Sequence, residues 1–149
     1  MLDIQTTIDI QASPHRIWAM LIDIGHYRDW NPFITAATGT IKPGQKLDIT
    51  LAPAPQKRSR FKPTVMHLKT GQALAWRHRL PIPGLFTREQ GFVLSELEDG
   101  NIRLSHSQTF RGLWAWLCRR SLHEEMTAGM KAMNQTLKER AESRNAGSR

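Results

Sequence analysis

The fold is decided by the stretch NIRLSHSQTFRGLWAWLCRRSLHEEMTAGMKAMNQTL, which covers residues 101–137. In residues 101–111 every second side chain falls on the same face of a strand. Further along, the apolar residues recur every three to five positions, which is the spacing of one face of a helix. The stretch therefore predicts a strand that leads into a long C-terminal helix, which runs from Leu113 to Ala141 if it is continuous.

Two features of this helix bear on the interior of the protein. Met126, Met130 and Met133 follow its apolar face, and methionine both fills irregular gaps in cores and tolerates varied apolar ligands. Gly129 lies inside the helix, where glycine costs about 1 kcal/mol relative to alanine. We therefore expect either a kink or a close backbone approach at Gly129.

The same spacing rules predict the elements that precede this stretch. Residues 2–10 alternate with the period of a half-buried strand, and Ser13-Pro14 is typical of a helix start, with that helix ending near Asp23. A second strand begins at Phe33. Turn residues then separate further strand-length runs, which are 45–52, 59–68, 73–80, 86–97 and 101–111.

Short links between consecutive strands favour an antiparallel meander, and the final helix is the only element large enough to cover it. The sequence thus predicts an α+β fold. In it, a curved seven-stranded antiparallel sheet wraps around the long C-terminal helix. Two short helices lie between the first and second strands.

Length and composition limit the class of protein. At 149 residues, with 40% hydrophobic and 23% charged residues, the chain fits one globular domain, which we place at residues 1–142 before a frayed tail at 143–149. The sequence has no signal-peptide pattern and no apolar run long enough to span a membrane, so we expect a cytoplasmic protein. Cys118 is the single cysteine and no Cys and His cluster has metal-ligand spacing, so neither a metal nor another cofactor is expected.

The formal net charge of +8 favours anionic partners at long range. The basic residues are scattered and are not interleaved with aromatic residues, which disfavours nucleic acid. Strand parity places several of them on the outer face of the sheet, namely Arg60, Lys62, Arg77, Arg79 and Arg103. This basic face is either simply solvated or makes peripheral contact with an anionic membrane or an acidic partner.

Seven segments spread along nearly the whole chain carry a resemblance to known proteins. They are Ser13-Pro14, residues 27–33 (YRDWNPF), Gly44, Leu74-Ala75-Trp76, residues 83–86 (PGLF), residues 109–112 (TFRG) and residues 133–138 (MNQTLK). In order and spacing they resemble the SRPBCC superfamily, also called START-like or helix-grip proteins, in its polyketide cyclase/dehydrase-like branch.

The resemblance implies a helix-grip fold with a deep cavity between sheet and C-terminal helix that holds lipids, polyketides or other hydrophobic ligands. It implies no single reaction, because members include carriers, cyclases, chaperone activators and ribosome-binding proteins. Related sequences often carry a His near the start of the sixth strand and a Glu late in the seventh. Those positions are Gln90 and Gln108 here, so the chain lacks this acid/base pair.

Strand parity indicates which side chains would line such a cavity. The inward face is predicted to be apolar with four polar exceptions, His78, Gln90, His106 and Gln108. These four could orient a ligand, or each could be a hydrogen-bonded core side chain. Trp30 could likewise form a cavity rim or fill space beside the short helices. The expected ligand-binding residues are Trp30, Asn31, Trp76, His78, Gln90, Phe92, His106, Gln108, Phe110, Met126, Met130 and Met133.

His78 and His106 are the candidate catalytic residues, because imidazole can exchange protons near neutral pH. Neither has an inward carboxylate partner, so no catalytic residue is assigned. The leading hypothesis is binding, transport or sequestration of a hydrophobic small molecule, such as a lipid or a polyketide-like compound. The alternatives are a polyketide cyclase/dehydratase-like enzyme and a protein or ribosome interaction module that uses the basic face.

A further cluster stands at the entry to the long helix. Trp114 and Trp116 lie there beside Arg111, Arg119 and Arg120. Aromatic and basic residues in this combination are typical of a membrane-interface patch. A half-buried junction between strand and helix would have the same composition, so both interpretations stay open.

Overall fold

The computed structural model describes residues 1–147, with side chains up to Ser143. Its elements are β1 (Leu2–Ile10), α1 (Pro14–Ile22), the 3-10 helix η1 (Ile24–Asp29), β2 (Ile34–Thr38), β3 (Asp48–Ala54), β4 (Lys57–Phe61), β5 (Thr64–Lys69), β6 (Ala73–Arg79), β7 (Thr87–Glu96), β8 (Ile102–Arg111), α2 (Leu113–Leu117) and α3 (Arg119–Gly147). The predicted α+β class is confirmed. The frayed tail predicted for 143–149 reaches outside the described residues and stays a prediction.

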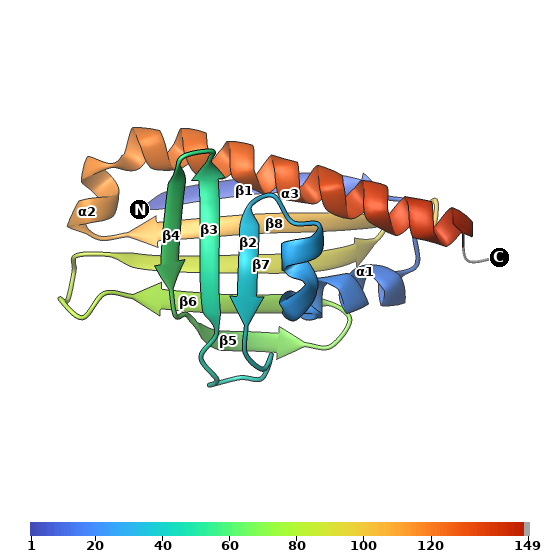
Figure 1. The fold of residues 1–149 in the computed structure, drawn as a ribbon, viewed down its shortest axis with the longest axis horizontal. Coiled ribbons are helices and arrows are strands. Elements are labelled where there is room, and N and C mark those ends of the chain that lie inside the picture. The colour runs from blue at the N-terminus through green and yellow to red at the C-terminus, as the bar shows by residue number, and fades with distance from the viewer. Residues whose placement is uncertain (148–149) are drawn as a thin grey trace.

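The strands form two antiparallel sheets that face each other. The larger sheet has the order β1-β8-β7-β6-β5, and the smaller has the order β2-β3-β4. Figure 1 shows the smaller sheet running across one face of the larger, with α3 along the side formed by β1 and β8. The apolar core therefore lies between the two sheets and α3.

The eight strands differ from the seven that the sequence predicted, because the run 59–68 divides into β4 and β5. Pro63 stands between them and has no backbone N–H to offer a ladder, while its carbonyl accepts a hydrogen bond from Leu47 at 2.8 Å. The chain passes from the smaller sheet to the larger at this corner. The single curved sheet of the prediction is thus two sheets joined through Pro63.

The helix predicted from Leu113 is also divided, with a break at Cys118. The backbone N–H groups of Leu113 and Trp114 donate to carbonyls of Gly84 and Leu85, at 3.0 and 2.9 Å, in the loop between β6 and β7. These bonds hold α2 against that loop, so α3 begins in a new direction at Arg119. Helix α1 begins as predicted, with the hydroxyl of Ser13 accepting from the N–H of Arg16 at 3.2 Å.

The close approach predicted at Gly129 is confirmed, and its partner is Phe33. A Cβ atom built on Gly129 would lie 2.2 Å from the Phe33 ring, a distance that atoms of this kind do not reach. Phe33 is fully buried. The ring therefore rests directly on the backbone of α3, and glycine is required there to admit it.

We predict that Gly129→Ala destabilises the fold, although alanine is the better helix former. Overpacking a core costs about 1–3 kcal/mol, which exceeds the gain of about 1 kcal/mol in helix propensity. Chemical denaturation of Gly129→Ala, Phe33→Leu and the double variant measures this. The double variant should lose less stability than the two single changes added together; strict additivity would contradict the contact.

Candidate functional site

The inward face of the larger sheet carries the side chains that the alternation predicted. Trp76, Phe92 and His106 are each at most 1% exposed. The strands align them in rows, since Gln90 lies opposite both Trp76 and Gln108, and Phe92 lies opposite His106 in the next row. Antiparallel pairing thus brings Gln90, His106 and Gln108 together, as the sequence predicted.

A chain of hydrogen bonds crosses the interior from β6 to β1. Trp76 Nε1 donates to Gln90 Oε1 at 3.2 Å, and Gln90 Nε2 donates to His106 Nε2 at 2.8 Å. His106 Nδ1 donates to Asn134 Oδ1 on α3 at 2.9 Å, and Asn134 Nδ2 donates to Thr6 Oγ1 at 2.8 Å. The Thr6 hydroxyl closes the chain by donating to the carbonyl of His106 at 3.2 Å. Each polar side chain in it makes at least one hydrogen bond, so the network ties four strands to α3.

This network determines the protonation of His106. Because Asn134 presents its oxygen to Nδ1, that nitrogen carries the proton and Nε2 accepts from Gln90. Complete burial lowers the pKa of His106 to about 4, and the bond to Asn134 only partly offsets this effect. The imidazole is therefore neutral near pH 7, and its one free lone pair is already engaged. In this arrangement His106 has no basic site left for a substrate.

Gln108 contrasts with Gln90, its neighbour across the strand pair. Its side chain is fully buried, and neither its amide oxygen nor its amide nitrogen has a hydrogen-bond partner among the described residues. A buried polar group without a partner costs about 1–3 kcal/mol. Gln108 is thus the predicted polar anchor whose hydrogen-bonding capacity is unused.

A fifth polar residue, Arg88, lies on the inward face, so the prediction of four polar exceptions is wrong. It is 6% exposed and lies opposite His78 on β6 and Phe110 on β8. Arg88 precedes Gln90 by two residues, and parity alone would have placed it inside. A charged side chain is rarely buried, and here three aromatic rings surround the guanidinium. The sequence did not predict the role of Asn134 either, because a polar residue does not contribute to the apolar spacing that marks the buried face of a helix.

His78 lies in a different setting from His106. It is half-buried two rows away, with its ring 5.2 Å from that of Phe61. Partial burial lowers the pKa of His78, and the positive charge of Arg88 lowers it further. A surface pocket of about 410 Å³ opens beside it and is lined by Lys46, Lys62, Thr64, Met66, Arg77, His78 and Arg79.

Trp30 and Asn31 lie at the end of η1, away from the polar network. The Trp30 ring makes an edge contact with Tyr27, with centroids 5.3 Å apart, and borders a surface hollow that His26 also lines. Asn31 Oδ1 accepts from the N–H groups of Phe33 and Ile34, at 2.9 and 2.8 Å. Asn31 therefore holds the turn that presents Phe33 to α3. A ligand contact at either residue stays a prediction.

The space that the resemblance assigned to a cavity is filled by side chains in this structure. Met126, Met130 and Met133 on α3 belong to the same buried cluster as Phe33, Trp76, Phe92 and Phe110. Trp76, Phe92, Met130 and Met133 are 0–1% exposed, so they border no space large enough for a water molecule. A ligand would have to displace these side chains to enter.

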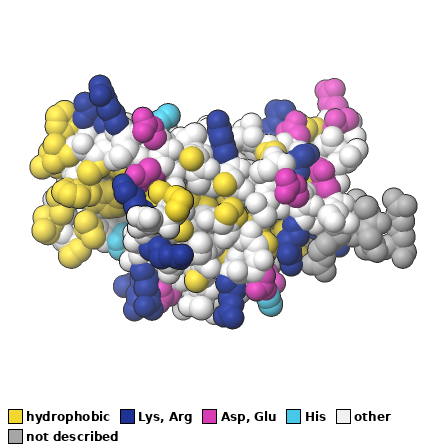
Figure 2. All heavy atoms as spheres, turned by 45° about the horizontal axis from the view of Figure 1, so that its top comes forward, with side chains coloured by type: hydrophobic (Ala, Val, Ile, Leu, Met, Phe, Trp, Pro, Cys, Tyr) yellow, Lys and Arg dark blue, Asp and Glu magenta, His cyan; other side chains and the backbone are white. Residues whose placement is uncertain are grey.

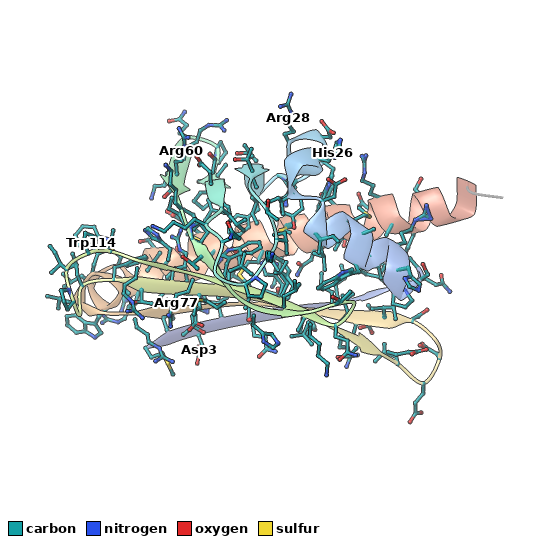
Figure 3. All side chains as sticks on the ribbon, turned by 90° about the horizontal axis from the view of Figure 1, so that it is seen from below. Asp3, His26, Arg28, Arg60, Arg77 and Trp114 are labelled. Atoms are coloured by element: carbon teal, nitrogen blue, oxygen red, sulfur yellow. The ribbon has the colours of Figure 1, made fainter. Side chains whose placement is uncertain are left out.

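The basic residues predicted for the outer face fall on two different sheets. Arg60 on β4 belongs to the smaller sheet and pairs with Asp48 at 2.6 Å, whereas Arg77 lies on the larger sheet (Figure 3). Arg103 pairs with Asp9 at 2.8 Å. The structure therefore divides the predicted basic face, and Lys62, Arg77 and Arg79 gather instead around the pocket beside His78.

Comparison with protein families matches residues 1–142 to the family described as "Polyketide cyclase / dehydrase and lipid transport". The chain belongs to this family. No match was found among curated proteins. The family description joins enzymes and lipid carriers, so it supports hydrophobic ligand binding or cyclase activity in general terms.

Solved structures of the START-like superfamily share the fold of this polyketide cyclase/dehydrase family member. An aromatase/cyclase from Streptomyces superposes with a TM-score of 0.74 at 15% identity, covering 96% of this chain and 94% of that chain. A START superfamily protein from Mycobacterium smegmatis gives 0.72 at 17% identity, covering 95% and 97%. A hypothetical protein from Helicobacter pylori gives 0.77 at 14% identity, covering 94% and 88%. These likenesses show the fold alone.

Among residues 1–147, no helix is both long and apolar enough to cross a membrane. Within the same residues, no three or more His, Cys, Asp or Glu side chains come together as a group that could hold a metal ion.

The buried, neutral His106 predicts a specific loss of stability in acid. The unfolded chain binds a proton at an ordinary pKa near 6.5, but folded His106 does so only at about 4. Stability from this residue is therefore complete above pH 6.5 and falls as the pH drops toward 4, by up to roughly 3 kcal/mol. Unfolding free energies measured by denaturation across this range should show a shallower slope for His106→Gln than for the unchanged protein.

His67→Gln is the control for this measurement, because His67 is exposed on β5. This variant should keep the original pH dependence. Equal slopes for His106→Gln and the unchanged protein would show that His106 is protonated as easily in the folded state as in the unfolded one.

Proposed function

We propose that this protein binds a hydrophobic small molecule between the larger sheet and α3 and carries or sequesters it. The observation that supports this best is the composition of the buried interior. Met126, Met130 and Met133 face an interior that also contains Trp76 and Phe92. Thioether side chains change rotamer easily and repack around varied apolar shapes. An interior of this kind can open for a ligand and close again without it.

The state of His106 favours binding over catalysis. A general base needs an accessible lone pair, and the imidazole of His106 uses its own to accept from Gln90. A cyclase/dehydratase-like reaction would thus depend on His78, which lies two rows away at the pocket beside β6. The carrier function requires no proton transfer and is the simpler account of this interior.

A titration with the neutral fluorescent probe Nile red tests the proposed interior site. We expect saturable binding with a rise in fluorescence. Met130→Phe, which fills the interior with a larger and stiffer side chain, should weaken binding by roughly tenfold, equal to about 1.4 kcal/mol. If that variant does not fold, Met126→Phe serves the same purpose.

Val93→Phe is the matched control, since Val93 is 45% exposed on β7 and lies outside the pocket beside His78. It should bind Nile red as the unchanged protein does. Native mass spectrometry of freshly purified protein adds an independent measurement. A protein that takes up no probe and carries no co-purified apolar molecule would contradict the proposal.

We also propose that the end of the molecule formed by α2 contacts an anionic membrane surface. Leu113, Trp114, Trp116 and Leu117 are 53–59% exposed, while Ala115 alone anchors α2 in the core at 2%. Ile82 adds a further exposed apolar side chain. Figure 2 shows hydrophobic side chains gathered at this end, flanked by Lys and Arg, and Figure 3 shows Trp114 at its tip.

The charges around α2 suit a bilayer interface. The guanidinium of Arg119 lies 4.7 Å from the ring centroid of Trp116 and also donates to its carbonyl at 2.8 Å. Arg111 and Arg120 stand at either end of the same segment. Tryptophan at the level of the lipid headgroups, together with arginine near the phosphates, is the usual composition of an interfacial anchor.

Sedimentation with vesicles tests this contact. We expect the protein to bind mixed phosphatidylcholine and phosphatidylglycerol vesicles more strongly than phosphatidylcholine alone, and the double change Trp114→Ala and Trp116→Ala should abolish most of the binding. Val93→Ala, at an exposed apolar position on β7, is the control and should bind normally. Equal binding by the double variant would contradict the proposal, as would self-association through this end in size-exclusion chromatography.

A further inference from the structure

Arg88 is buried in an aromatic enclosure between the two sheets. Its Cζ atom lies 4.6 Å from the ring centroid of Phe61 on β4, 5.3 Å from that of Phe110 on β8 and 5.5 Å from that of Phe86. The faces of aromatic rings attract a cation, which accounts for the position of the guanidinium. Rings do not accept hydrogen bonds as a carboxylate does, so the N–H donors of Arg88 need other partners.

For Nε, such a partner is missing in the described part of the chain. The ion pairs formed there involve other residues, and no carboxylate lies within salt-bridge distance of Arg88. Its Nε is buried without a hydrogen-bond partner. Burial lowers the pKa of Arg88 to about 10, so the side chain still carries its positive charge at neutral pH. A buried charge of this kind is normally paired or neutralised.

Gln108, on the neighbouring strand β8, also lacks hydrogen-bond partners. Arg88 pairs with Phe110, so Gln108 is its diagonal neighbour on the same face of the sheet. Both amide atoms of Gln108 are buried and unpartnered. The chain leaves two adjacent polar side chains unsatisfied here, although it satisfies every polar side chain of the Gln90–His106 network one row further on.

We propose that Arg88 and Gln108 bind an anionic oxygen group, of the carboxylate type, at one end of the hydrophobic ligand. This inference rests on the proposed carrier function and specifies its ligand class: an apolar body with an acidic head. The planar guanidinium presents paired N–H donors that match the two oxygens of a carboxylate. The amide N–H of Gln108 can donate to the same group. A bound carboxylate would neutralise the buried positive charge of Arg88. It would thereby remove the free-energy cost of leaving that charge unpaired in the closed structure.

The approach to this site is basic. Arg88 lies opposite His78, and both side chains contact the ring of Phe61. His78 in turn lines the surface pocket that Lys46, Lys62 and Arg79 surround. Positive charge at the mouth attracts an acidic molecule and raises its rate of association. Arg88 is thus the buried cross-strand neighbour of His78, which lies at the entrance.

Binding of parinaric acid and of its uncharged methyl ester, both followed by their own fluorescence at neutral pH, tests the proposal. The two probes share one apolar body and differ at the head. The unchanged protein should bind the acid at least about tenfold more tightly than the ester, as for a charge-assisted hydrogen bond. Arg88→Met should bind both probes with the affinity of the unchanged protein for the ester. Gln108→Leu should lose a smaller part of the preference for the acid.

Arg28→Met is the matched control, because it removes one positive charge from an exposed position on η1 that does not line the pocket beside His78. It should keep the preference for the acid. If the unchanged protein binds the ester and the acid equally, or if Arg88→Met keeps the preference, the anion site is refuted while the carrier function stands. If neither probe binds, the carrier function itself fails.

Thermal unfolding of the ligand-free protein separates a binding role from a purely structural one. A binding arginine that is unpaired without ligand should cost nothing to remove, so Arg88→Met should melt at the same temperature or higher. An arginine that serves only to fill the aromatic enclosure should lower the melting temperature when it is replaced. A marked loss of stability, together with unchanged probe binding, would assign Arg88 to packing alone.

Discussion

The contact between the Phe33 ring and the backbone at Gly129 is the constraint on which the rest of the interior depends. It sets how closely α3 approaches the sheets, because any side chain at Gly129 would push the ring away. Asn31 holds the turn that aims Phe33 at the helix. With α3 at this distance, Asn134 reaches His106 on β8, and the polar network can close. The absence of a Cβ atom at Gly129 therefore positions both the apolar core and the buried hydrogen-bond network through His106 and Asn134.

The polar side chains on the inward face of the larger sheet fall into two sets. One set is hydrogen-bonded within the protein, and the other set has buried polar atoms without hydrogen-bond partners. Gln90 and His106 use their buried hydrogen-bonding groups within the chain from Trp76 to Thr6. Arg88 and Gln108 lie beside them with buried groups unused. Evolved cores rarely leave such groups unpaired, since each one reduces stability. The unpaired set therefore supports the proposed ligand contact better than the paired set does, although both sets are buried.

Alternation along the strands predicted the inward face of β6, β7 and β8 almost completely, because burial of one face fixes the parity of every residue. Gly129, inside the helical pattern, also predicted a close approach to the backbone of the helix. The division into two sheets could not be predicted from this alternation, because it depends on how the chain turns at Pro63. Burial of Arg88 depends on three rings from separate elements, and the choice of Asn134 depends on the depth at which α3 packs. Such features arise from tertiary contacts that no local pattern encodes.

The closed interior and a binding function are compatible in energetic terms. The closed structure buries methionine and aromatic surface, which is favourable, but it leaves Arg88 Nε and the side-chain amide of Gln108 without hydrogen-bond partners, which is not. The closed state is thus less stable than its apolar burial alone would make it. A ligand with an acidic head would exchange flexible methionine contacts for its own apolar contacts and would supply the missing acceptor. The complex would then gain an ion pair and hydrogen bonds at Arg88 that the ligand-free protein does not form. This gain favours uptake of the ligand without requiring a permanently open cavity.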